Sequence, residues 1–228
     1  MEENIKQNAT SPPEATAGGS YGHGWGTLKK YFLELLLITF IIVLINVPFG
    51  WFNKSSLTNY NYDFTNSLYS MLYWVLIASP IEYGVIYLFL KAVRGETVQI
   101  KDIFQPFNQF VDVVLANILV TGIVIAGFIL LIIPGIVFAI KLVFVPYLVM
   151  DRKMNAISAV KESWKMTGGF GWTIFGMAIL AFFICVGGFI VFFVGIIVSL
   201  MWIGAAFASL YYAVDSKKNS SSVVTENN

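Results

Sequence analysis

The stretch LLIIPGIVFAIKLVFVPY, residues 130 to 147, places Lys141 inside an otherwise apolar run. This run lies within an apolar stretch of about forty residues, whereas a single membrane span needs only about 20. The stretch is therefore expected to fold back on itself as a helical hairpin. Pro134 and Gly135 are the expected turn, because proline resists helix continuation and glycine accepts turn geometry.

The composition places the chain among membrane proteins. Of the 228 residues, 57% are hydrophobic and 12% are charged, compared with about 25% charged in an ordinary soluble domain. The net charge of +1 gives no overall field that would favour nucleic acid as a partner. A single cysteine and a single histidine exclude an internal disulfide and argue against a His/Cys metal site within one chain. We expect no cofactor.

Apolar runs separated by short polar joints predict an all-α fold, a polytopic transmembrane helix bundle of six spans. The spans are expected at residues 32 to 52, 68 to 90, 111 to 133, 135 to 150, 173 to 193 and 195 to 214. Gly187, Gly188 and Gly195 are the candidates for the last turn. Residues 29 to 215 are then one membrane domain, flanked by disordered cytoplasmic tails over 1 to 28 and 216 to 228.

The distribution of lysine and arginine predicts the orientation of these spans. The joints after the even-numbered spans and the two tails together carry nearly all basic residues, whereas the opposite joints carry only Lys54. The basic residues on the first side are Lys6, Lys29, Lys30, Lys91, Arg94, Lys101, Arg152, Lys153, Lys161, Lys165, Lys217 and Lys218. By the positive-inside rule, both termini are cytoplasmic.

A weak internal repeat suggests that the six spans form three hairpins. GFILLIIPGI at 127 to 136 and GFIVFFVGI at 188 to 196 share their spacing to within one residue. Each expected hairpin follows a short cytoplasmic segment that contains aromatic residues and lysines, which predicts short amphipathic helices there. The alternative is that apolar helices with similar ends resemble one another without a repeat.

The segment MNAISAVKESWKMTGG, residues 154 to 169, has the pattern of an amphipathic interfacial helix. Ile157, Val160 and Trp164 fall on one face, and Gly168 is placed to end the helix. Basic residues here can attract anionic lipid headgroups; the alternative is that they only enforce the topology. The expected interfacial lipid contacts are Arg152, Lys153, Lys161, Trp164 and Lys165.

Two intramembrane charges are the main candidates for a polar site. With Asp151 and Lys91 as the cytoplasmic ends of their helices, Glu82 and Lys141 lie at similar depth near the bilayer midplane. A lone charge there is costly, so we predict that Glu82 and Lys141 form a pair between the second and fourth spans. The alternative is that Lys141 extends its side chain towards the interface and that Glu82 is protonated. In the sixth span, Gly204 and Ala208 form a small-residue face suited to close helix packing.

The stretch from Ile132 to Gly169, preceded by GETVQIKDIFQPFNQF at 95 to 110, resembles the bacterial YciC-like inner-membrane family and the related membrane domain of glycerophosphodiester phosphodiesterases. The shared features are an Ile-Pro-Gly hairpin, a helix with a basic residue, a Pro-Tyr pair and an Ala-to-Thr-Gly amphipathic segment. This resemblance implies a bacterial cytoplasmic membrane and little about activity.

No convergent set of ionisable side chains typical of a membrane enzyme is evident from the sequence. The cytoplasmic carboxylates Asp102, Asp112, Asp151 and Glu162 are expected to be solvated or salt-bridged. We therefore predict a noncatalytic multi-pass membrane protein that binds membrane lipid or a membrane partner, either another protein or a second copy of the chain. The alternative is a small transporter or lipid flippase that uses Glu82 and Lys141.

Overall fold

The computed structural model describes residues 11–58, 64–190 and 192–226, with side chains described for 11–46, 68–190 and 195–220. Every regular element in these ranges is a helix. The helices are α2 (Ala17–Lys30), α3 (Phe32–Thr58), α4 (Phe64–Tyr73), the π-helix η1 (Trp74–Ala78), α5 (Ser79–Arg94), the 3-10 helix η2 (Ile100–Gln109), α6 (Phe110–Leu130), α7 (Ile132–Leu142), α8 (Val145–Asp151), α9 (Ala156–Met166), α10 (Gly171–Ile190) and α11 (Phe192–Glu226).

Several of these helices, alone or joined end to end, have the length and composition of membrane spans. Within the described side chains there are five such stretches, and a shorter apolar helix, Phe32–Asn46, precedes them. The five stretches are Leu68–Arg94, Ile100–Leu130, Ile132–Asp151, Gly171–Ile190 and Gly195–Ser220. The predicted all-α class is thus confirmed for the described residues, and the fold fits a membrane protein.

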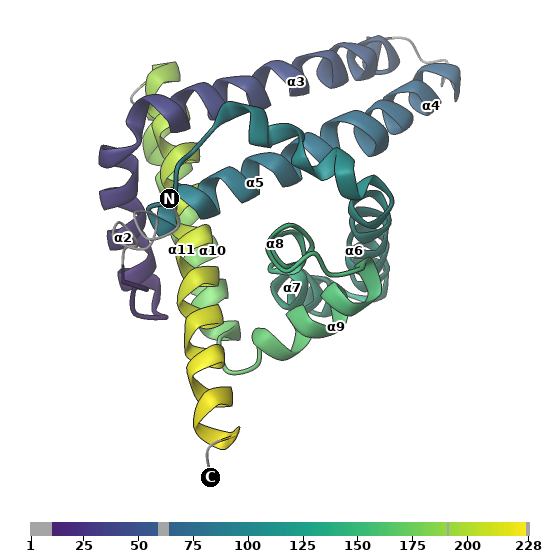
Figure 1. Ribbon diagram of the computed structural model, residues 1–228. Helices are drawn as coiled ribbons and strands as arrows, with labels where there is room; N and C mark the ends of the chain where they lie inside the picture. Colours follow the sequence, from purple (N-terminus) through teal and green to yellow (C-terminus); the bar gives the residue numbers. More distant parts are fainter. Residues whose placement is uncertain (1–10, 59–63, 191, 227–228) are drawn as a thin grey trace.

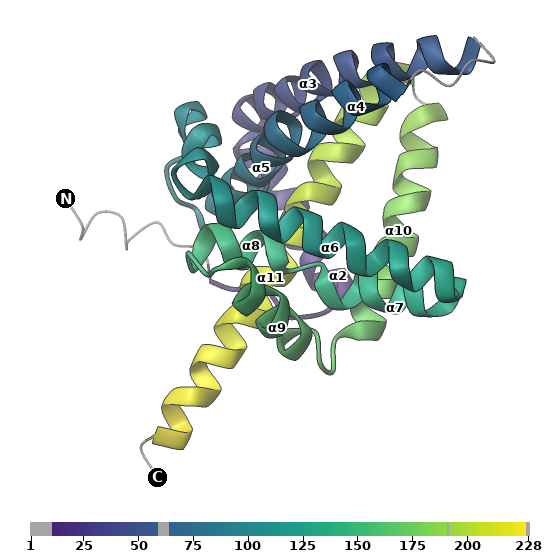
Figure 2. The same ribbon diagram turned by 90° about the vertical axis from the view of Figure 1, so that its right-hand side faces the viewer.

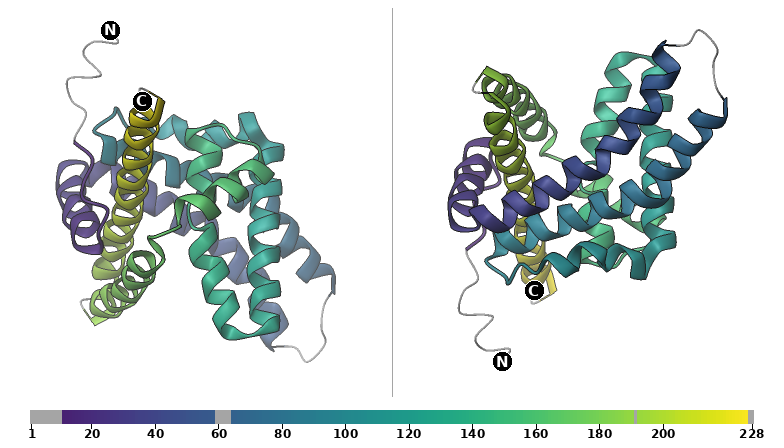
Figure 3. Two further views of the ribbon diagram at one scale, coloured as in Figure 1. Left: turned by 90° about the horizontal axis from the view of Figure 1, so that it is seen from below. Right: turned by 90° about the horizontal axis from the view of Figure 1, so that it is seen from above.

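Consecutive helices lie side by side in pairs: α3 with α4, α6 with α7, and α10 with α11 (Figures 1 and 2). Figure 3 shows the turn between α6 and α7, and the junction of α10 with α11, at the end of the molecule opposite the C-terminal end of α11. Buried side chains of α5, α8 and α11 form the centre of the core, among them Leu88, Leu148 and Tyr211.

The reversal between α6 and α7 is at Leu131, not at the predicted Pro134 and Gly135. Leu131 has an extended backbone, and its N–H donates to the carbonyl of Gly127 at 3.0 Å. Pro134 falls in the first turn of α7, where its missing N–H leaves no helical bond unmade. Gly135 instead permits close helix packing. A Cβ added to Gly127 would lie 2.9 Å from the Cα of Gly135, so these two glycines let α6 and α7 approach closely.

Two prolines interrupt the helices near the core. Pro146, in the first turn of α8, offers no N–H to the carbonyl of Leu142, and the chain breaks between α7 and α8 at Val143 and Phe144. Pro80, at the start of α5, likewise cannot bond to the carbonyl of Leu76, and the preceding turn widens into the π-helix η1. The regular α-helical hydrogen-bond pattern is therefore interrupted in both spans.

Part of the segment predicted as a disordered N-terminal tail is the helix α2. The Thr16 hydroxyl caps it by accepting from the N–H of Gly19 at 3.1 Å. Tyr21 anchors it, because its hydroxyl donates to the carbonyl of Met177 and its own carbonyl accepts from the Trp202 indole, each at 2.9 Å. Helix α11 also continues to Glu226, past the predicted boundary at residue 216.

Helix α11 packs through small residues on two sides. A Cβ on Gly24 of α2 would lie 2.8 Å from the backbone nitrogen of Ala206, so this glycine lets α2 lie against α11. On the α5 side, a Cβ on Gly204 would lie 3.1 Å from the Phe89 ring, and Ala208 is fully buried. The predicted small-residue face therefore packs inside the protein.

Candidate functional site

A groove between α7 and α10 combines an apolar lining with a charge. Its cavity is about 510 Å³, and its walls include Ile136 and Ile140 of α7 and Trp172 and Phe175 of α10. This volume lies within the range of about 300 to 1,000 Å³ common for ligand sites. Lys141 lines the groove where α7 ends and α10 begins.

A second cavity adjoins the first. It measures about 610 Å³ and shares Ile136, Ile140 and Phe175 with it, then continues along α10 to Phe182 and Phe183. Those two phenylalanines are more than 60% exposed, at 65% and 63%. The face formed by α7 and α10 is therefore apolar, outward-facing and hollowed, with its charged group at one end only.

Lys141 is held at this end by α9. Its carbonyl, in the last turn of α7, accepts from the Ser163 hydroxyl at 2.7 Å and from the Thr167 hydroxyl at 3.5 Å. Its Nζ lies 5.8 Å from the centroid of the Trp164 ring, a cation–π distance. Within the described side chains Lys141 forms no ion pair.

The structure does not bring Glu82 and Lys141 together. Among the described side chains the two form no ion pair, and Lys141 lies against Trp164 instead. Lys141 lies beside α9 instead, since its carbonyl accepts from the Ser163 hydroxyl and its ammonium lies over the Trp164 ring.

Helix α9 is amphipathic, as the sequence predicts. It buries Ala159, Ser163 and Met166, while Ile157 and Trp164 stay 56% and 43% exposed. The Asn155 side chain caps its start by accepting from the N–H of Ser158 at 2.9 Å. The left-handed backbone that follows the helix falls on Gly169, with φ of 84°, rather than on Gly168.

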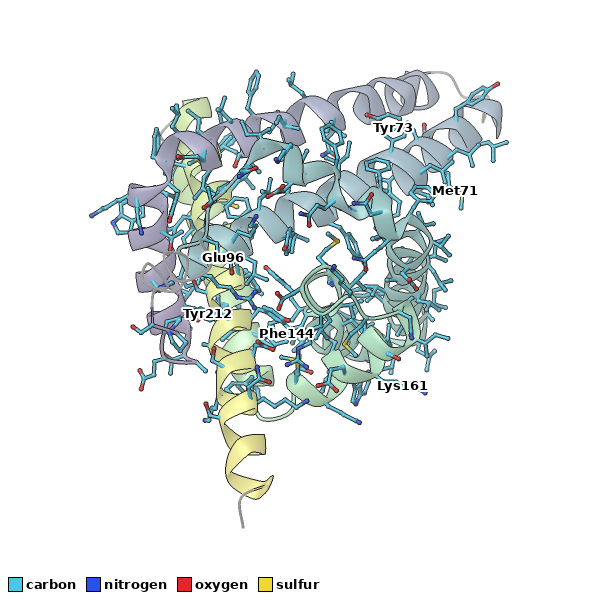
Figure 4. All side chains as sticks on the ribbon, in the orientation of Figure 1. Met71, Tyr73, Glu96, Phe144, Lys161 and Tyr212 are labelled. Atoms are coloured by element: carbon cyan, nitrogen blue, oxygen red, sulfur yellow. The ribbon has the colours of Figure 1, made fainter. Side chains whose placement is uncertain are left out.

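The predicted lipid contacts divide into two groups. Lys153, Lys161 and Lys165 are exposed, and Figure 4 shows Lys161 on the outer side of α9. Arg152 is engaged within the protein, with one guanidinium nitrogen 2.5 Å from an Asp215 oxygen. Trp164 belongs to both groups. Its ring contacts Phe138 and the Lys141 ammonium, and part of the side chain stays exposed.

An ionic cluster that includes Arg152 joins the C-terminal ends of α5 and α8 to α9 and α11. Its core is a bidentate contact in which Arg94 donates to both oxygens of Asp151 at 2.5 and 2.7 Å, and the Tyr211 hydroxyl donates to Asp151 at 2.9 Å. The cluster holds three cations and three anions: Arg94, Arg152, Lys218, Asp151, Glu162 and Asp215. Balanced charge and partial burial indicate a structural cross-link.

The pKa values of two carboxyl groups outside the spans are shifted by burial and by neighbouring cations. The hydrogen bond from Lys218, opposed by partial burial, lowers the pKa of Glu162. Burial raises the pKa of Glu96, which follows α5 (Figure 4), although Arg94 and Lys91 act in the opposite direction. A neighbouring ion pair, from Lys91 to Asp102 at 2.6 Å, fastens η2 to α5.

The cytoplasmic carboxylates were expected to be solvated or salt-bridged, but the sequence does not predict that Asp151 and Glu162 join one cluster with Asp215. Arg94 lies 57 residues from Asp151, and Arg152 lies 63 residues from Asp215, so no local spacing signals these two pairs. Within the described residues, no group of three or more His, Cys, Asp or Glu side chains is placed to hold a metal ion.

No family model, curated protein or solved structure matches the chain. The resemblance to YciC-like membrane proteins therefore stays a prediction.

Proposed function

We propose that this chain is a noncatalytic multi-pass membrane protein that holds a membrane lipid, with an acyl chain in the groove between α7 and α10. The observation that carries the proposal is the outward-facing apolar groove of about 510 Å³, joined to a second apolar cavity. In a bilayer such a groove faces acyl chains. Transport through Glu82 and Lys141 has less support, because the two side chains do not pair.

The proposed topology has six spans in three hairpins, with both termini on the cytoplasmic side of a bacterial inner membrane. The side-by-side helix pairs and the one-sided distribution of lysine and arginine support it. The amphipathic helix α9 would then lie in the cytoplasmic interface, with Ile157 and Trp164 towards lipid.

Cysteine labelling tests this topology. In a Cys185→Ala background, Ser56→Cys is expected to react with an impermeant maleimide in intact cells. Ser216→Cys is expected to react only after lysis, because residue 216 follows the sixth predicted span, 195 to 214. Labelling of Ser216→Cys from outside would contradict either the orientation or the even number of spans.

Filling the groove tests lipid binding. Val137→Trp places an indole in the groove and is expected to lower the phospholipid retained per protein, measured by native mass spectrometry after purification in mild detergent. Loss of roughly ten carbon–carbon contacts, at about 0.1 to 0.2 kcal/mol each, corresponds to about fivefold to thirtyfold weaker retention.

The matched control is Val186→Trp. Val186 lies on α10 and is 44% exposed, against 42% for Val137, but it lines neither cavity. Retention by this variant is expected to equal that of the unmodified protein. If both tryptophan variants retain lipid equally well, the groove is not the lipid site.

A further inference from the structure

We propose that the lipid held in the α7–α10 groove is an anionic glycerophospholipid whose headgroup binds at Lys141. This inference rests on the proposed function, since it specifies the ligand of the same groove. It commits to a lipid of the leaflet on which α9 lies, with an acyl chain along Ile136 and Ile140 and a phosphate beside the Lys141 ammonium.

The charge of Lys141 is the first argument. A cation beside apolar walls is unfavourable unless an anion or water compensates it. Lys141 forms no ion pair among the described side chains, and its Nζ has the Trp164 ring 5.8 Å away. An aromatic face offsets part of the cost of a cation but does not neutralise it. The groove therefore has at one end a positive charge without a carboxylate partner among the described side chains, which a lipid phosphate complements.

The position of this charge is the second argument. Lys141 lies at the C-terminal end of α7, and the same cavity is lined by Gly169 and Gly171 at the start of α10. The opposite wall continues into the apolar cavity bordered by Phe182 and Phe183. One polar end and a long apolar remainder match the shape of a phospholipid, with its headgroup near Lys141 and its chain beyond.

The surroundings of Lys141 favour a headgroup without an amine. The first turn of α10 adds partial positive charge from N–H groups that have no partner within the helix. Lys165 is exposed on α9, the helix that contacts Lys141 through Ser163. A zwitterionic headgroup would bring its ammonium towards this positive region, whereas a phosphatidylglycerol headgroup brings only negative charge. The geometry thus points to a preference for phosphatidylglycerol over a zwitterionic lipid that has the same phosphate and the same acyl chains.

Headgroup competition tests this inference. Full-length protein is exchanged in nanodiscs that contain equal amounts of phosphatidylglycerol and phosphatidylcholine with identical acyl chains, and the lipid retained on release into mild detergent is measured by native mass spectrometry. The unmodified protein is expected to favour phosphatidylglycerol by about fivefold, the contribution of roughly one basic group. This preference is expected to fall as salt is raised, because salt screens the attraction.

Two substitutions assign the preference to Lys141. Lys141→Gln is expected to abolish it, and Lys141→Arg to keep it, because the arginine retains the charge. Lys161→Gln removes an exposed lysine of α9 outside the groove and is expected to leave the preference unchanged. If Lys141→Gln does not fold, two measurements still test the proposal. A preference that does not fall as salt is raised, or one that Lys141→Arg loses, overturns it.

The two proposals fail in different ways. If Val137→Trp leaves total lipid retention unchanged, the groove is not a lipid site and the proposed function fails. If Val137→Trp lowers total retention but the unmodified protein binds both lipids equally, or Lys141→Gln keeps the preference, the groove holds a lipid and the anionic assignment is overturned.

Discussion

Replacing Asp151 with asparagine is expected to lower the free energy of unfolding by about 3 to 5 kcal/mol, the cost typical of leaving a buried charge without its partner. Asp151 accepts from both terminal nitrogens of Arg94 and from the Tyr211 hydroxyl. The Arg94 side chain is only 18% exposed, so water cannot readily replace the lost carboxylate. Its remaining acidic contact, with Asp215, is 3.8 Å long.

Reversible unfolding in mixed micelles, followed by tryptophan fluorescence, measures this loss. Asp112→Asn is the matched control, since it makes the same atomic change at a carboxylate whose hydrogen bond, from the backbone N–H of Ala156, is 3.4 Å long. The control is expected to cost less than about 1 kcal/mol, the typical worth of such a bond. Equal costs for the two variants would mean that the Arg94 contact is solvated and weak.

A double replacement separates pairing from packing. Arg94→Gln together with Asp151→Asn removes both charges, and part of the loss is expected to be recovered because no unpaired cation remains. Additive losses would instead attribute the effect to the packing of Tyr211 and Phe144, whose rings lie 5.6 Å apart.

The sequence predicts the helices better than it predicts their breaks. Apolar length and the pattern of Ile157, Val160 and Trp164 are local properties, so the membrane-length helices and α9 could be anticipated. The turn at Leu131 could not be anticipated, because the sequence pattern is the same whether proline lies in the first turn of a helix or in a loop. The same ambiguity applies to Pro146, which lies in the first turn of α8.

Helix α2 was missed because of its glycines. The segment AGGSYGHGWG has low helix propensity when taken alone. In the fold the same residues permit close packing, since Gly24 lies against the backbone of Ala206, and the bonds of Tyr21 fasten the helix to α10 and α11. Tertiary contacts that join residues up to 186 positions apart, as between His23 and Ser209, leave no trace in local propensity.

The candidate site could be predicted only in part. Lys141 stands out as a charge in an apolar run, and Trp164 as the aromatic of an amphipathic helix. Their contact depends on the break after α7, which lets α9 reach the carbonyl of Lys141 through Ser163 and Thr167. The groove itself depends on how α7 and α10 meet, and no pattern within either helix encodes that.

Replacing Gly84 with alanine is expected to destabilise the protein by about 2 kcal/mol or more, at the upper end of the usual cost of overpacking. A Cβ at this position of α5 would lie 2.1 Å from the carbonyl oxygen of Ile103 and 2.8 Å from its carbonyl carbon. These are backbone atoms, so no rotamer change relieves the clash. Ile103 is 1% exposed, and the Lys91–Asp102 ion pair holds η2 in place, so η2 cannot move away cheaply.

Gly122→Ala is the matched control for this clash. Gly122 lies inside α6 with no atom within 4 Å of its added Cβ, so alanine there is expected to be neutral or to stabilise by up to about 1 kcal/mol through helix propensity. The two changes add the same methyl group to the interior of an apolar helix. Their difference in unfolding free energy, measured in the same micelles, therefore isolates the contact between α5 and η2. If Gly84→Ala behaves like Gly122→Ala, η2 does not lie against α5 as described.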